Sequence, residues 1–180
     1  MKSLRLTIKA WPVIAIATIG LCYLTQTVAG WFGVELPDQA NIEIVRHYAG
    51  WNRNFVFLCL QVIVLMPAVE ELVFRYLLWR LPTRALDKRR KTEDEDGQKT
   101  EDGRRINTAS VVAVVSSILF SAAHYIVQPF PDAAFIALFF FGLAQCWLYR
   151  KTGHLWCTIL NHALFNLTNL VLLFVLPKAA

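Results

Sequence analysis

The stretch FVFLCLQVIVLMPAVEELVFRYLLWRL, residues 55–81, decides the fold of this chain. It is long and apolar enough for a helix that crosses a hydrocarbon core about 30 Å thick. Yet it contains two adjacent acids, Glu70 and Glu71, and Arg75 follows about one helical turn later. An Asp, Lys or Arg at the centre of a spanning helix costs roughly 2.5 to 3.5 kcal/mol even on mild scales, so ionisable groups there point to a functional site.

The composition of the whole chain is that of an integral membrane protein. Hydrophobic residues make up 56% of its 180 residues and charged residues 17%, outside the usual range of a soluble domain. Four more apolar stretches have spanning length: residues 11–29, 108–127, 133–149 and 155–176. We therefore predict an all-α, polytopic membrane helix bundle of about five transmembrane helices, with residues 1–180 as one domain.

The basic residues predict how the chain crosses the membrane. They concentrate before the first span, between the second and third, and between the fourth and fifth, which would all lie on one side. The positive-inside rule then places the N-terminus in the cytoplasm of a bacterial inner or plasma membrane. The net charge of +5 is explained by this topology, and without a basic patch interleaved with aromatics we expect no nucleic-acid partner.

Two segments of the chain need a separate interpretation. The N-terminus has the features of a signal peptide up to Gly30, but its apolar run exceeds the usual 7 to 15 residues, which favours a retained anchor. Residues 83–106 carry eight basic and seven acidic residues and few apolar ones, so we predict a flexible cytoplasmic loop.

Three short polar motifs lie inside the predicted spans. Residues four apart share one face of a helix, and each motif contains such a pair: Glu71 with Arg75, Phe120 with His124, and His162 with Asn166. Glu71 can thus be compensated by Arg75, whereas Glu70 points about 100° away around the helix. Glu70 is therefore the candidate general base.

Counting along the helices indicates that these groups can meet. At about 1.5 Å per residue, Glu70 lies roughly 16 Å, His162 roughly 14 Å and Asn166 roughly 20 Å from the cytoplasmic ends of their helices. His124 lies deeper, at roughly 20 to 26 Å depending on where its helix enters the hydrocarbon. Pro67 frees backbone groups that only a protein-lined or watered cavity can satisfy.

Polar residues of membrane bundles can also simply tie helices together by buried hydrogen bonds. We interpret Thr158, Asn161, Thr168 and Asn169 in that way, and His154, near the interface, similarly. Two acids, an arginine and two histidines at similar depth call for a chemical explanation.

The three motifs, in this order on successive helices, resemble those of the CAAX-protease and bacteriocin-processing family of intramembrane endopeptidases. The resemblance covers about residues 67–166: EExxxR at 70–75, FxxxH at 120–124 and HxxxN at 162–166. Phe139, Gly142 and the stretch from Tyr149 to Trp156 support it. The chain departs from the family at Tyr76, where glycine is frequent, and in having fewer spans than the eukaryotic enzymes.

The resemblance implies a role for each motif residue. Glu70 would activate a water with the help of His124, while His162 and Asn166 would hold the developing oxyanion. The supporting residues would be Glu71, Arg75 and Phe120. This version needs no cofactor, and we favour it over a zinc site built from Glu70, His124 and His162, for which no HExxH motif is present.

The predicted function is therefore that of an intramembrane endopeptidase that hydrolyses a peptide bond of a membrane-associated protein or peptide substrate. The alternative is a non-enzymatic membrane immunity or scaffold protein whose buried polar residues are structural. A small transporter that uses Glu70 and the histidines as a relay is disfavoured, because the chain shows no internal repeat.

Overall fold

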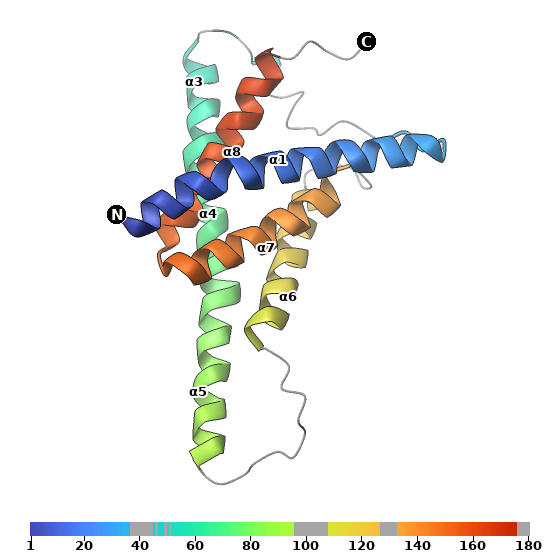
Figure 1. Cartoon of the computed structure of the whole chain (residues 1–180). Coiled ribbons are helices and arrows are strands. Elements are labelled where there is room, and N and C mark those ends of the chain that lie inside the picture. The colour runs from blue at the N-terminus through green and yellow to red at the C-terminus, as the bar shows by residue number, and fades with distance from the viewer. Residues whose placement is uncertain are drawn as a thin grey trace.

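The computed structural model describes residues 1–36, 45, 47–48, 50, 52–95, 108–126 and 133–175. All regular structure in these residues is helical, as predicted (Figure 1). The α-helices are α1 (Lys2–Trp31), α3 (Arg53–Leu60), α4 (Met66–Glu71), α5 (Leu81–Glu95), α6 (Thr108–Ala123), α7 (Ala134–Thr152) and α8 (Leu155–Val175). A single 3-10 turn, η3 (His124–Ile126), follows α6.

The decisive stretch forms the middle of one continuous helix from Arg53 to Glu95, drawn in green in Figure 1. Asn52 caps its N-terminus, where the side-chain Oδ1 accepts a hydrogen bond from the Phe55 N–H at 2.9 Å. Two π-helical segments, η1 (Gln61–Leu65) and η2 (Leu72–Arg80), flank the short α4 that carries both acids. Such π-turns are frequent at functional sites.

Four helices are long and apolar enough to cross a membrane. They are α1, the stretch Arg53–Lys88 of the long helix, the stretch Thr108–Ile126, and α8. The predicted span over residues 133–149 forms α7, but α7 is not among them; its last turn carries Arg150 and Lys151. The chain is thus a multi-pass helical membrane protein with four such helices in its described part, where we predicted about five.

The charged segment differs from the expectation of a loop over residues 83–106. The long helix continues through it as far as Glu95, and residues 96–106 lie outside the described part of the chain. Adding a residue to an existing helix costs far less than nucleating a new one, and Leu, Ala, Lys, Arg and Glu all have high helix propensity. The helix that begins in the apolar stretch therefore extends into the charged residues as far as Glu95.

The core lies where α1, α6, α7 and α8 meet. Phe120, Phe141, Leu148 and Phe165 are buried there against Ile14 of α1. Helices α6 and α7 approach closely because Gly142 has no side chain: a Cβ on it would lie 2.9 Å from the Ser117 Cβ. Small residues at a helix contact are the usual way to bring membrane helices together.

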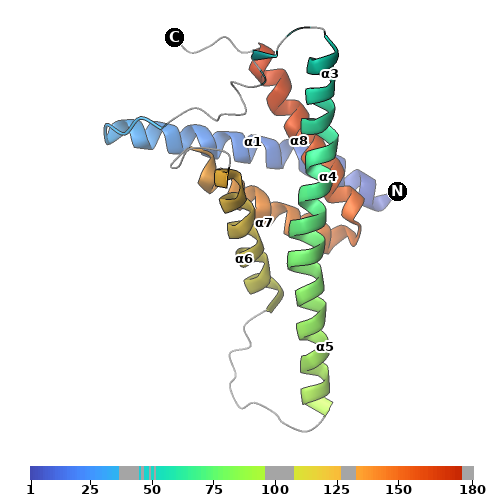
Figure 2. The ribbon, with the colours of Figure 1, turned by 180° about the vertical axis from the view of Figure 1, so that it is seen from behind.

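The helices cross one another around this core. Figures 1 and 2 show α7 alongside α1 and α8 passing beside α3 and α4, and α1 contacts both α7 and α8. Polar side chains join these helices, as we expected for Asn161 and Thr168. The Gln145 amide donates to the Asn161 side-chain oxygen at 2.9 Å, and the Trp11 indole donates to the Thr168 hydroxyl at 3.1 Å.

Candidate active site

The two acids of α4 lie in different surroundings. The Glu71 side chain is 0% exposed, whereas that of Glu70 is 20% exposed. Adjacent residues point about 100° apart around a helix, which turns one carboxylate into the bundle and leaves the other at its edge. Only Glu70 is therefore within reach of a water or a substrate arriving from outside.

Glu71 and Arg75 form the ion pair that their spacing predicts. The Arg75 Nε lies 3.4 Å from the Glu71 Oε2, and both side chains are 0% exposed. None of the Arg75 nitrogens makes an aligned hydrogen bond within the described residues, and the guanidinium lies 4.5 Å from the centroid of the Phe120 ring. The arginine is held by charge and by cation–π contact.

His162 of α8 lies between the two acids. Its Nδ1 is 3.0 Å from the Glu71 Oε1, and its Nε2 is 3.6 Å from the Glu70 Oε2. An ionised Glu71 accepts the hydrogen bond, so Nδ1 carries a proton and Nε2 is the atom that faces Glu70. The long helix and α8 are joined at this point, and the depth count that brought Glu70 and His162 together is confirmed.

The Phe120 ring connects this cluster to the second histidine. It packs edge-on against His162, with centroids 6.0 Å apart, and against His124, with centroids 4.9 Å apart. The His124 Nδ1 lies 2.9 Å from the Phe120 carbonyl oxygen, to which it donates. Within the described residues His124 makes no hydrogen bond or ion pair with either acid, so it lies at the edge of the cluster.

Asn166, one turn after His162, makes a contact that the sequence did not indicate. Its side-chain amide donates to the Val62 carbonyl oxygen at 2.8 Å. In the π-helical register of η1 that carbonyl would accept from the N–H of residue 67, but Pro67 has none. The backbone group that we expected Pro67 to free is therefore satisfied by Asn166, whose amide keeps a second N–H.

The candidate zinc ligands are not gathered into one group. Among the residues that the structure describes, no set of three or more His, Cys, Asp or Glu side chains is arranged to hold a metal ion. Glu70 and His162 are neighbours, while His124 directs its Nδ1 to a backbone carbonyl. These residues, as placed here, do not fit a two-histidine, one-carboxylate site.

A protein-family model matches more than half of this chain. The family model described as "Type II CAAX prenyl endopeptidase Rce1-like" matches residues 52–168, which include all three motifs. Searches of curated proteins and of solved structures give no match.

Proposed function

Because this chain belongs to the Rce1-like family of type II CAAX prenyl endopeptidases, whose membership implies an intramembrane protease, we propose that it hydrolyses a peptide bond of a membrane-associated protein or peptide. The observation that carries the proposal is the bridge that His162 makes between a buried and a partly exposed glutamate. A cluster built only for packing has no need of the second, open carboxylate.

In the proposed reaction Glu70 is the general base. A water held at its exposed carboxylate would lose a proton to Glu70 while its oxygen attacks the carbonyl carbon of the scissile peptide. The proton would then pass from Glu70 to the leaving amine as the C–N bond breaks. His124, at the edge of the cluster beyond Phe120, would help to position the water.

The charges of the cluster support a role for His162 in holding the oxyanion. A protonated His162 carries N–H groups on both ring nitrogens, so Nε2 can donate to the oxyanion while Nδ1 donates to Glu71. With that proton, two carboxylates face two cations, Arg75 and His162, and the buried group is neutral overall. The second amide N–H of Asn166 would add a fixed donor, and such preorganised donors stabilise transition-state charge strongly in a dry site.

Zinc dependence is the competing chemistry for the same residues. The proposed reaction uses no metal, because the placement of Glu70, His124 and His162 does not fit one. The glutamate mechanism instead requires only the contacts of Glu70, His162 and Asn166 that the structure already contains.

The test is cleavage of a membrane-embedded reporter peptide by the full chain and by Glu70→Gln. We expect the variant to stay folded and to lose a factor of about 10² to 10⁴ in rate, the usual contribution of a general base. Glu35→Gln, a glutamate outside the cluster, is the matched control and should cleave normally, as should a chain lacking residues 96–106. Full activity of Glu70→Gln would disprove the mechanism.

The same variants separate the protease from the non-enzymatic alternative. An immunity or scaffold protein would lose folding or partner binding in Glu70→Gln, His124→Ala and His162→Ala alike. Cleavage by the parent chain together with a folded Glu70→Gln protein that does not cleave is incompatible with that alternative.

A further inference from the structure

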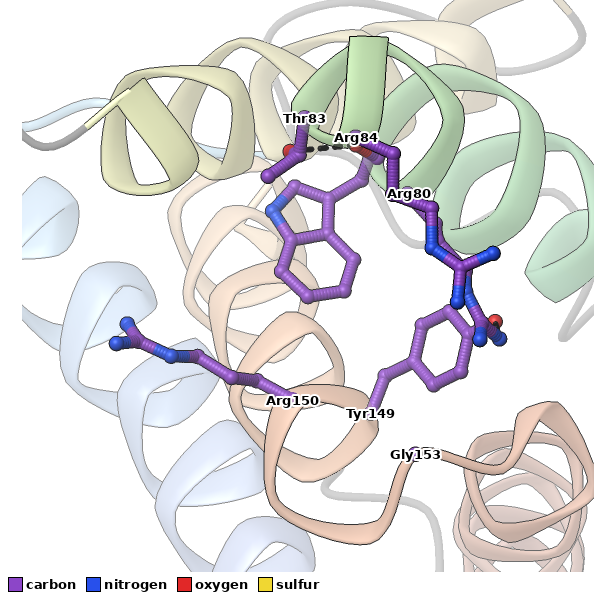
Figure 3. A pocket seen from close by; sticks show the side chains of 7 residues that line it. Arg80, Thr83, Arg84, Tyr149, Arg150 and Gly153 are labelled. Atoms are coloured by element: carbon purple, nitrogen blue, oxygen red, sulfur yellow. Dashed lines mark hydrogen bonds between the residues drawn. The ribbon is translucent and has the colours of Figure 1, made fainter. Parts of the chain in front are cut away.

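A pocket of about 210 Å³ lies apart from the acids, between the long helix and the end of α7 (Figure 3). It is lined by Trp79, Arg80, Thr83, Arg84, Tyr149, Arg150 and Gly153. Arg80 is ten residues from Glu70, about 15 Å along the helix. An occupant of this pocket therefore does not touch the cluster proposed for catalysis.

The pocket is strongly basic. Three of its lining residues are arginines, and no carboxylate from the described part of the chain lines it. Arg80 and Arg84 are four residues apart on one helix, a spacing at which like charges repel. In Figure 3 their side chains descend toward Tyr149, while Arg150 extends away on the opposite side. An anion between them would relieve this repulsion.

The walls of the pocket are fixed by their own contacts. The Arg80 guanidinium donates to the Tyr149 hydroxyl and lies 5.1 Å from the centroid of that ring. The Trp79 indole donates to the Ala109 carbonyl at 3.1 Å, and the Thr83 hydroxyl donates to the Trp79 carbonyl at 2.7 Å. Arg84 and Arg150 are exposed and reach past these walls.

The position along the chain indicates where the anion comes from. Arg80 stands at the end of the apolar run 55–81, on the side where the charge pattern predicts the cytoplasm. Tryptophan and tyrosine favour the membrane–water interface, and the cytoplasmic leaflet carries the anionic lipids. Guanidinium groups bind phosphate through paired N–H donors, which an ammonium group cannot match.

We propose that this pocket binds the phosphate of an anionic phospholipid, held by Arg80 and Arg84 beside Tyr149. The aromatic walls would face the glycerol and upper acyl groups. Lipid bound there would fix the long helix against the end of α7.

The experiment measures lipid binding to the delipidated full chain in detergent by native mass spectrometry. Short-chain phosphatidylglycerol is compared with phosphatidylcholine of the same acyl length and with inorganic phosphate. We expect phosphatidylglycerol to bind most tightly. Its affinity should fall about fivefold in Arg84→Gln, as expected for the loss of one basic contact.

Lys151→Gln is the matched control, since Lys151 is an exposed cation beside Arg150 that does not line the pocket. Its affinity should be unchanged. Equal binding of the two lipids, or equal losses in the control and in Arg84→Gln, would overturn the proposal. Inorganic phosphate binding as tightly as phosphatidylglycerol would also overturn it, because the site would then hold free phosphate.

Arg84 is exposed, so Arg84→Gln should unfold at the same denaturant concentration as the parent when no lipid is present. If Arg84→Gln does not, Arg84→Lys takes its place. It keeps the charge without the planar donor pair, and it should bind phosphatidylglycerol more weakly than the parent.

Discussion

Replacing Glu71 by glutamine should destabilise the protein far more than the same change at Glu70. The glutamine side chain keeps nearly the same shape and still accepts a hydrogen bond from His162, but it leaves the Arg75 charge uncompensated. At the 3.4 Å separation of this pair, the Coulomb energy is about 5 kcal/mol at an effective dielectric constant of about 20. Breaking a buried ion pair by removing one partner typically costs about 3 to 5 kcal/mol.

Glu70→Gln is the matched comparison one residue away. Its contact with His162 is 3.6 Å long, which is beyond hydrogen-bond distance, and His162 keeps its closer contact with Glu71. We therefore expect a loss of no more than about 1 kcal/mol. The free energies of unfolding are measured in mixed micelles by titration with sodium dodecyl sulfate. Equal losses at the two positions, or a Glu71→Gln loss under about 1 kcal/mol, would refute this assignment of the acids.

A double variant tests whether the cost comes from the uncompensated charge. Glu71→Gln combined with Arg75→Met removes both ions and fills the space of the arginine with an apolar side chain. Replacing a buried pair by apolar residues is often neutral, so the double variant should recover most of the stability lost in Glu71→Gln. No recovery would indicate that the loss has another cause.

Three more predictions concern two other contacts and the metal dependence of cleavage. Asn166→Ala leaves the Val62 carbonyl unsatisfied and should cost about 1 to 3 kcal/mol in the same unfolding titration, whereas a stability equal to that of the parent would contradict the contact. Gly142→Ala forces a Cβ against Ser117 and should lower the free energy of unfolding by about 1 to 3 kcal/mol. Ser117→Gly in the same chain should restore part of that stability. If the Gly142→Ala chain is as stable as the parent, α6 and α7 move apart freely. Peptide cleavage should persist after exhaustive dialysis against a chelator, and loss of activity that added zinc restores would replace the glutamate mechanism with a metal-dependent one.

Features set within one helix could be predicted from the sequence. The spacing of Glu71 and Arg75 fixes them on one face whatever else the helix touches, and their ion pair is present. The lengths of the apolar stretches likewise predicted the helices. Residues 133–149 are helical as predicted, but α7 is not among the four candidate spans, and Arg150 and Lys151 directly follow its apolar part.

Features that depend on how helices rotate against each other could not be predicted. Counting residues placed Glu70 and His162 at one depth, but it did not show that Glu71 would take the closer contact with His162. The π-turns on either side of α4 have no signature in hydropathy, because they change the backbone register and leave the composition as it is. The hydrogen bond from Asn166 to Val62 depends on one of these turns.

That hydrogen bond has a consequence for how substitutions combine. Its acceptor is a main-chain carbonyl, so position 62 should tolerate any apolar side chain of suitable size, while positions 67 and 166 should depend on each other. A residue other than proline at 67 has a backbone N–H that could donate to the Val62 carbonyl. The hydrogen bond from Asn166 would then be dispensable for stability. In a library randomised at both positions, stable chains without Asn166 should therefore be those that have also lost Pro67.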